Sequence, residues 1–185
     1  MLASISLQSR WSVSLAARLL HLTEKVYFGV GNKFSVSSMS APAQQQTDRG
    51  KCVFCRICDG VEPNNILHQD DEFVVFPDIR PAAPHHYLIV PRHHYIDVKN
   101  LSADHIPMVE KMVSLSKEVL IAQGGCESTA RLGFHWPPFH TVSHLHLHII
   151  APEAEMGFIA RGMFKKDSFW FVSPETAIQR LRQKM

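Results

Sequence analysis

The stretch TVSHLHLHIIAPE, residues 141–153, constrains this 185-residue chain most, because histidine alternates there with apolar residues. A strand points successive side chains to opposite faces, so His144, His146 and His148 would share one face and the apolar residues the other. Three histidines on one face repel one another when protonated, and they displace better strand formers such as valine. The pattern therefore indicates a strand with one buried apolar face and one chemically active face.

Composition favours a soluble, globular protein in a reducing compartment. Hydrophobic residues make up 45% and charged residues 19% of the chain, and no apolar run approaches the roughly 18 residues that cross a bilayer, so no membrane partner is expected. The formal charge is +2 without a block of like charges, which disfavours a nucleic-acid partner. Cys52, Cys55 and Cys58 lie close together and Cys126 lies apart, unlike a secreted disulfide framework.

The first 50 residues differ in composition from the rest. Glu24 is the single acid of residues 1–45, which are rich in serine and carry four cations, Arg10, Arg18, Lys25 and Lys33. This composition is typical of a mitochondrial transit peptide. The alternative is a disordered extension, and Met39 could begin a shorter product. We expect an N-terminal extension over residues 1–50 and a folded domain over residues 51–185.

The folded part predicts an α+β domain. Two apolar runs, residues 73–76 and 87–90, are separated by a proline-rich link and predict two strands. Apolar residues at helical spacing predict a long helix over residues 102–123. Residues 130–136 predict a further strand before the histidine strand, and residues 175–185 predict a short helix. Strands before and after one long helix indicate an antiparallel sheet of about five strands.

Three explanations compete for the histidine strand. Histidines at alternate positions can bind a catalytic zinc ion. One imidazole can instead attack an electrophile while its neighbours orient it and stabilise charge. The third explanation is purely structural. A zinc site normally has an acid or base close by, whereas Glu153 and Glu155 follow this strand instead of flanking it. We therefore favour covalent catalysis.

Two motifs in this order resemble the histidine triad superfamily. They are His-Leu-His-Leu-His-Ile-Ile at residues 144–150 and FPDIRPAAPHHYLIVPRHH at residues 76–94. The resemblance covers roughly residues 51–172, and the segments over residues 131–148 and 168–172 are most similar to a branch of adenosine 5'-monophosphoramidases. It implies the histidine triad fold, with one long and one shorter helix. It also implies hydrolysis of adenosine phosphoramidates, and of acyl- or aminoacyl-adenylates, to AMP through a covalent nucleotidyl-histidine.

The resemblance implies a role for each catalytic candidate. His146 would be the nucleophile that attacks the α-phosphorus, since imidazole titrates at about pH 6.5 and is largely neutral at pH 7. His144 would orient it through its backbone carbonyl, and His148 would donate to a phosphate oxygen. His86 would steady the change from neutral to charged. Thr141 stands where relatives carry serine, and its hydroxyl would pass a proton to the leaving amine.

The resemblance also implies a nucleotide site. Asp78 would accept hydrogen bonds from the two ribose hydroxyls, which suits a carboxylate, although an aspartate before IRP could instead cap a turn. His135 stands where some relatives carry an asparagine that touches phosphate, and HWPPFH replaces a glycine-rich loop there, which leaves the leaving group open. The apolar walls of the purine pocket, each of which could equally be plain core, would be Phe54, Ile57, Phe76 and Ile79.

The cysteines raise a separate prediction. Cys52 and Cys55 have the spacing of zinc ligands, and some superfamily members complete such a site with residues that correspond to His94 and His144. Catalysis itself would need no cofactor, so the zinc would be structural. The alternative is a pair of small buried cysteines, because other relatives lack the pair.

The resemblance implies an adenosine nucleotide as substrate, a homodimer or higher homo-oligomer, and a location in cytoplasm and nucleus, or in mitochondria if residues 1–45 act as a transit peptide. One alternative is deadenylation of 5'-adenylated DNA ends, as in the aprataxin branch. Members of that branch usually continue into a zinc finger, and no such set of cysteines and histidines follows the triad here. Another is a non-catalytic nucleotide-binding scaffold, against which the intact His146 argues as the sole role.

Overall fold

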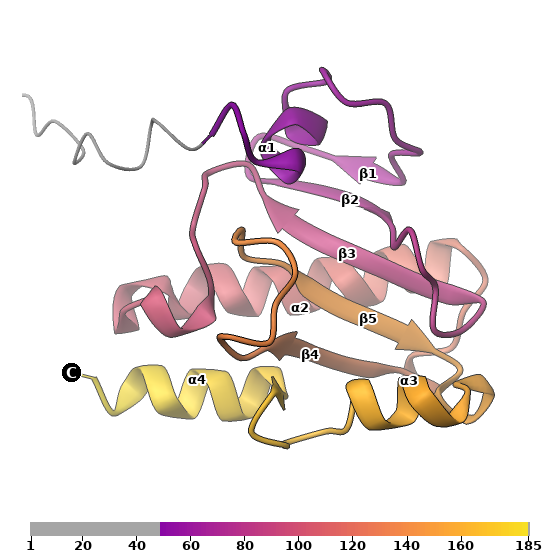
Figure 1. The fold of residues 1–185 in the computed structure, drawn as a ribbon. Coiled ribbons are helices and arrows are strands. Elements are labelled where there is room, and N and C mark those ends of the chain that lie inside the picture. The colour runs from indigo at the N-terminus through magenta and orange to yellow at the C-terminus, as the bar shows by residue number, and fades with distance from the viewer. Residues whose placement is uncertain (1–48, 185) are drawn as a thin grey trace, which may run out of the picture. The chain divides into compact units, whose positions relative to one another are not determined.

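The computed structural model describes residues 49–184, which form one antiparallel sheet with helices around it (Figure 1). The sheet has six strands in the order β1-β2-β3-β5-β4-β6. The strands are β1 His68–Gln69, β2 Phe73–Pro77, β3 His85–Pro91, β4 Arg131–His135, β5 Leu147–Ala151 and β6 Phe171–Val172. The α-helices are α1 Val53–Cys58, α2 Ile106–Ala122, α3 Phe158–Met163 and α4 Pro174–Arg182. Our expectations for the N-terminal extension lie outside the described residues.

The predicted α+β class is confirmed, and the differences concern short elements. The long helix α2 and the C-terminal helix α4 lie where the sequence predicts them. Strands β1 and β6 have two residues each, too few for an alternating pattern to appear in the sequence. The helices α1 and α3 have six residues each, fewer than two turns, so they show no helical period. Within residues 49–184, no helix is long and apolar enough to span a membrane.

The long helix α2 has clear signals at both ends. Ser102 precedes a 3-10 turn, Ala103–His105, which continues into the helix. Pro107 lies in the first turn, where its missing N–H costs no helical hydrogen bond. Gly124 follows the end of the helix with a φ of +82°, a left-handed conformation that glycine adopts without steric cost. The helix runs behind β3 and β5 in Figure 1.

The apolar residues that alternate with the histidines face the main core, as predicted. This core joins one face of the sheet to α2 and α4, and it contains Leu145, Leu147, Ile149, Val109, Met112, Leu120, Ala177 and Leu181. Alternation within an extended chain then points the histidines to the opposite face. The division of this stretch into an apolar face and a histidine face is confirmed.

The expectation that all three histidines lie on a regular strand is wrong. Strand β5 begins at Leu147, so only His148 belongs to it. The physical reason is a turn before the strand, in which the His144 N–H donates to the Val142 carbonyl at 2.9 Å. The chain has no partner strand along this turn, and the ladder to β3 begins only at Leu147, opposite Ile89.

Two smaller apolar clusters cover the histidine face of the sheet. One joins α1 to β2 and β3, and it contains Phe54, Ile57, Cys58, Val74, Phe76, Leu88 and Val90. The other gathers residues after β5 on the same face, namely Met156, Phe164 and Phe171, around Ile150 and Ala83. Both faces of β2 and β3 are therefore buried, which is why these strands read as continuous apolar runs.

Candidate active site

His146 is held in one tautomer. Its Nδ1 lies 2.6 Å from the backbone carbonyl oxygen of His144. A carbonyl can only accept, so Nδ1 carries the proton and donates it, and Nε2 keeps a free lone pair. Burial lowers the pKa of His146 to about 4, which keeps the ring neutral at pH 7. The ring of Phe54 packs edge-on against it, with centroids 5.2 Å apart. His146 is thus a preoriented nitrogen nucleophile.

The proton on His148 is fixed by a chain of two hydrogen bonds. The Ala82 N–H donates to Nδ1 of His86 at 3.0 Å, so the other nitrogen of His86, Nε2, carries a proton. That Nε2–H donates to Nδ1 of His148 at 2.9 Å. His148 must then carry its own proton on Nε2, which is buried and has no partner among the described residues. The site therefore offers one unused N–H donor beside the nucleophile.

His86 and His148, the two histidines linked by these hydrogen bonds, are both neutral at pH 7. Burial lowers the pKa of His86 to about 4, and the nearby Asp78 opposes this shift. Burial also lowers the pKa of His148 well below its ordinary value, and the neighbouring histidines add to the effect. The ring of Phe164 covers both of them, with centroid distances of 5.2 Å to each. An N–H donor in such a dry site is electrostatically strong.

Asp78 performs the turn-capping role that the sequence left open, and it also faces the histidines. It follows β2, and its Oδ1 accepts from the Arg80 N–H at 2.8 Å. Its Oδ2 lies 3.6 Å from Nε2 of His86 and 3.9 Å from Nδ1 of His148. A carboxylate has acceptor positions beyond the one that the turn uses. The proposed ribose contact stays a prediction.

The structure brings together most of the predicted purine-pocket residues. Phe54 and Phe76 make an edge contact with centroids 5.5 Å apart, and Ile57 belongs to the same cluster. Ile79 does not join them, because its side chain is 95% exposed. Three of the four residues therefore form a wall beside His146, and the role of the exposed Ile79 stays a prediction.

The other two predicted contacts lie on either side of the loop before the triad. His135 ends β4, and its ring meets that of His148 edge-on with centroids 5.0 Å apart. Its Nδ1 is buried without a partner among the described residues. Thr141 is exposed on the loop. The phosphate contact of His135 and the role of Thr141 both stay predictions.

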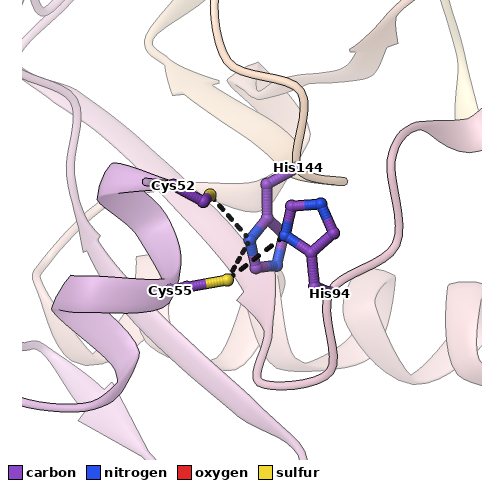
Figure 2. A group of neighbouring side chains, drawn as sticks. All are labelled: Cys52, Cys55, His94 and His144. Atoms are coloured by element: carbon purple, nitrogen blue, oxygen red, sulfur yellow. Dashed lines mark hydrogen bonds between the residues drawn. The ribbon is translucent and has the colours of Figure 1, made fainter. Parts of the chain in front are cut away.

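The two cysteines and two histidines predicted to hold zinc do lie together (Figure 2). Nδ1 of His144 lies 3.4 Å from Sγ of both Cys52 and Cys55, and Nδ1 of His94 lies 3.2 Å from Sγ of Cys55. A tetrahedral zinc ion separates sulfur and nitrogen ligands by roughly 3.5 Å. The donor set is thus of the right type and spacing for a structural zinc.

The tautomer of His144 fits the same conclusion. Its Nε2–H donates to the Pro91 carbonyl at 2.8 Å, so Nδ1 turns a lone pair toward the two sulfurs. This carbonyl support is how ligating histidines are commonly oriented. Burial raises the pKa of Cys55 to about 12, so metal binding there has to displace protons.

A second group, Asp78, His86 and His148, also has the composition of a metal site. The hydrogen bonds exclude it as one. The nitrogen of His86 that faces the group, Nε2, carries the proton because Nδ1 accepts from the Ala82 N–H. A protonated nitrogen has no lone pair to give to a metal. This group is therefore part of the donor chain to His148.

Comparison with known proteins agrees with this geometry. The family model described as scavenger mRNA decapping enzyme C-term binding matches residues 51–164. Adenosine 5'-monophosphoramidase HINT3 of Mus musculus is 40% identical over 165 residues, which cover 88% of this chain and 100% of that protein. The chain belongs to the histidine triad family. The resemblance read from the two sequence motifs is thereby confirmed.

Further histidine triad proteins support both the assignment and the fold. The HINT3 protein of Xenopus tropicalis is 41% identical over 133 residues, covering 71% of this chain and 87% of that protein. A solved structure of a HIT family hydrolase from Legionella pneumophila has 31% identity and a TM-score of 0.52, covering 54% of this chain and 91% of that one. The predicted histidine triad fold is confirmed.

Sequence reasoning missed several residues of this histidine triad site. Phe164 and Phe171 cover the histidines from the segment after β5, where a short helix gave no periodic signal. Gly133 lies opposite His148, and a Cβ there would come within 2.4 Å of the Phe171 ring. His140 also escaped notice, although a histidine on a loop beside a catalytic motif is a signal in itself.

Proposed function

We propose that this chain hydrolyses adenosine 5'-monophosphoramidates to AMP and an amine through a covalent nucleotidyl-histidine on His146. The observation that carries the proposal is the hydrogen bond from Nδ1 of His146 to the His144 carbonyl, which leaves Nε2 free for attack. The names of its HINT3 relatives support the substrate class. Acyl- and aminoacyl-adenylates would be attacked at the same phosphorus.

The first step is attack by the lone pair of His146 Nε2 on the α-phosphorus. A new nitrogen–phosphorus bond forms as the bond to the leaving amine breaks, and the Nε2–H of His148 donates to a phosphate oxygen. The Nδ1–H bond to the His144 carbonyl stabilises the charge that develops on the ring. Thr141 passes a proton toward the amine. Water then attacks the phosphorus and releases AMP.

The nucleotide is held by the residues around His146. The base packs against the wall formed by Phe54, Ile57 and Phe76, and the ribose hydroxyls donate to Asp78. His135 contacts the phosphate through its unpartnered nitrogen. None of these steps draws on a metal ion.

Release of AMP from an adenosine phosphoramidate tests this proposal. The purified chain is incubated with excess EDTA, and AMP is quantified by chromatography for the wild type and for His146→Ala. Sustained release by the wild type, with a loss on the order of a millionfold in the variant, supports the proposal. Release that stops with the chelator and survives in His146→Ala would point to a zinc hydrolase instead.

We also propose that Cys52, Cys55, His94 and His144 hold a structural zinc ion. Such an ion would tie α1 to the loop before β5, and with it the wall residue Phe54 to the nucleophile. The short sulfur–nitrogen distances and the tautomer of His144 support this assignment. Metal analysis of the purified chain tests it, with one zinc per chain as the expected result.

The oligomeric state and the location complete the proposal. We infer a dimer or higher oligomer, because the resemblance implies association; light scattering that gave the monomer mass at micromolar concentration would contradict it.

We infer cytoplasm and nucleus as compartments, or mitochondria if residues 1–45 act as a transit peptide. Comparing the localisation of the full chain with that of a chain starting at Met39 tests this. Identical diffuse staining of the two would contradict the transit-peptide hypothesis.

A further inference from the structure

The proposed chemistry leaves one requirement unmet, namely a proton for the leaving amine. An amine departs from phosphorus as a neutral molecule only if it gains a proton, so an acid has to stand near the breaking bond. Thr141 can pass on a proton, but a hydroxyl at neutral pH is too weak an acid to be its source. The source therefore has to be a group that titrates near neutral pH.

The triad has no nitrogen left for this task. His144 uses Nε2 on the Pro91 carbonyl and turns Nδ1 toward the cysteines. His146 uses Nδ1 on the His144 carbonyl and Nε2 on phosphorus. His148 uses Nδ1 on His86 and offers Nε2 to the phosphate.

His140 is the remaining histidine on the loop before the triad. Its Nε2 lies 3.2 Å from Oγ of Ser143, and its Nδ1 is buried with no partner among the described residues. A buried nitrogen that stays unpaired is energetically costly, so such an atom in a native structure indicates a site for a ligand or water partner. A bound substrate can supply that partner.

The position of His140 links it to the nucleophile. With His144 and His146 it lines a small cavity of about 10 Å³, close to the volume that a single water molecule needs. His140 and the nucleophile therefore border one cavity that is about the size of a water molecule.

We propose that His140 is a further catalytic residue, the acid that protonates the leaving amine and the base that then deprotonates the attacking water. This assignment rests on the proposed function. Imidazole suits both tasks because one ring nitrogen can give up a proton and later take one back. The proton can travel directly or through the neighbouring Thr141 hydroxyl.

Both steps of this reaction conserve atoms, electron pairs and protons. As the His146 Nε2 lone pair bonds to phosphorus, the phosphorus–nitrogen bond of the substrate breaks, and its electron pair on the amine takes the proton from cationic His140. In the second step the oxygen of water bonds to phosphorus and the His146–phosphorus bond breaks, returning its electron pair to Nε2. His140 takes the proton of that water and is cationic again.

The test compares two AMP derivatives in the full chain with His140→Gln. One is an adenosine phosphoramidate, whose amine needs a proton; the other is the 4-nitrophenyl ester of AMP, whose phenolate leaves without one. We expect kcat/KM to fall about 10²–10³-fold for the phosphoramidate and by less than about threefold for the ester. The ester should also show a burst of nitrophenolate followed by a slow phase, because water attack has lost its base. Ser143→Ala, which removes only the hydroxyl contact, should leave both rates near the wild type.

Two results would overturn the assignment. Equal losses of kcat/KM for both compounds would mean that His140 only supports the loop. A selective loss in Thr141→Val without one in His140→Gln would place the proton source elsewhere. A wild-type chain that released AMP from neither compound would instead refute the proposed function, and this outcome is distinct from both.

Discussion

Nε2 of His86 lies 2.9 Å from Nδ1 of His148, and the Ala82 N–H bonded to the other side of His86 fixes the direction of that hydrogen bond. The backbone N–H of Ala82, in the turn before β3, thus determines which nitrogen of His148 carries the proton, through two successive hydrogen bonds. The consequence is an N–H on His148 that has no partner among residues 49–184 and is available to a phosphate oxygen.

Replacing His86 with leucine should therefore weaken catalysis without touching the substrate directly. The His148 ring would lose the donor that fixes its tautomer, and we expect kcat to fall about 10–100-fold with little change in AMP affinity. The matched control is His85→Gln on the same strand, whose native ring contacts the Tyr87 hydroxyl at 2.7 Å instead of the triad. Steady-state kinetics of both variants checks this; equal losses in the two would contradict it.

The buried histidines should make the fold less stable in acid. Burial lowers the pKa of His86 and of His146 to about 4, whereas both groups titrate at about 6.5 in the unfolded chain. Above about pH 6.5 both histidines are neutral in the folded and in the unfolded chain, so they do not make the free energy of unfolding depend on pH. Below this pH the unfolded chain binds protons that the folded chain does not, so the free energy of unfolding falls as the pH drops toward 4, by about 1.4 kcal/mol per pH unit for each group.

Urea denaturation across this pH range measures the effect. His86→Leu removes one of the titrating groups, so its free energy of unfolding should depend on pH less steeply than that of the wild type, by about one proton. A variant with the wild-type slope would show that His86 is not a source of the acid sensitivity.

The sequence predicted the parts of this structure that follow from periodicity. Alternation placed Leu145, Leu147 and Ile149 in the main core, and helical spacing found α2. The turn at residues 141–144, which takes His144 and His146 out of the regular strand, depends on local hydrogen bonds that no alternating pattern reveals. The sequence also identified the zinc ligands only by resemblance, since His94 lies far along the chain from Cys55.

Tautomers and unpaired atoms lay beyond sequence reasoning altogether. The proton on His148 depends on a backbone N–H. That His140 Nδ1 has no partner in the described part of the chain depends on how a proline-rich loop folds. The short helices α1 and α3 were missed because six residues show no helical periodicity. The packing of Phe164, which follows α3, over the histidines was missed for the same reason.

Replacing Cys52 and Cys55, the two predicted zinc ligands, should lower the stability of the fold more than it lowers the catalytic rate. In Cys52→Ser/Cys55→Ser we expect zinc content to fall from one per chain to near zero and the melting temperature to drop, because metal binding contributes free energy to the folded state. Cys126→Ser is the control, since Cys126 is exposed and is not one of the clustered ligands. Metal analysis with thermal denaturation measures both; a variant that kept its zinc would rule out these ligands.

Gly133→Ala should be destabilising because the β4 backbone passes close to β6. The added Cβ would lie 2.4 Å from the Phe171 ring and 2.8 Å from the Val172 carbonyl oxygen, so the edge strand would have to shift. We expect a loss of about 1–3 kcal/mol in the free energy of unfolding. Gly157→Ala is the matched control, because a Cβ there meets nothing within 4 Å and its φ is −64°. Comparable stability of the two variants would contradict the packing argument.

The covalent intermediate is the central claim, and its direct test is to trap it. The chain is mixed with an adenosine phosphoramidate or with the 4-nitrophenyl ester of AMP, quenched at short times, and analysed by mass spectrometry before and after proteolysis. We predict a mass increase of one adenylyl group on the peptide that contains His146, strongest in His140→Gln with the ester and absent in His146→Ala. An active chain that never carries the adenylyl group, or that carries it on another residue, would contradict the account.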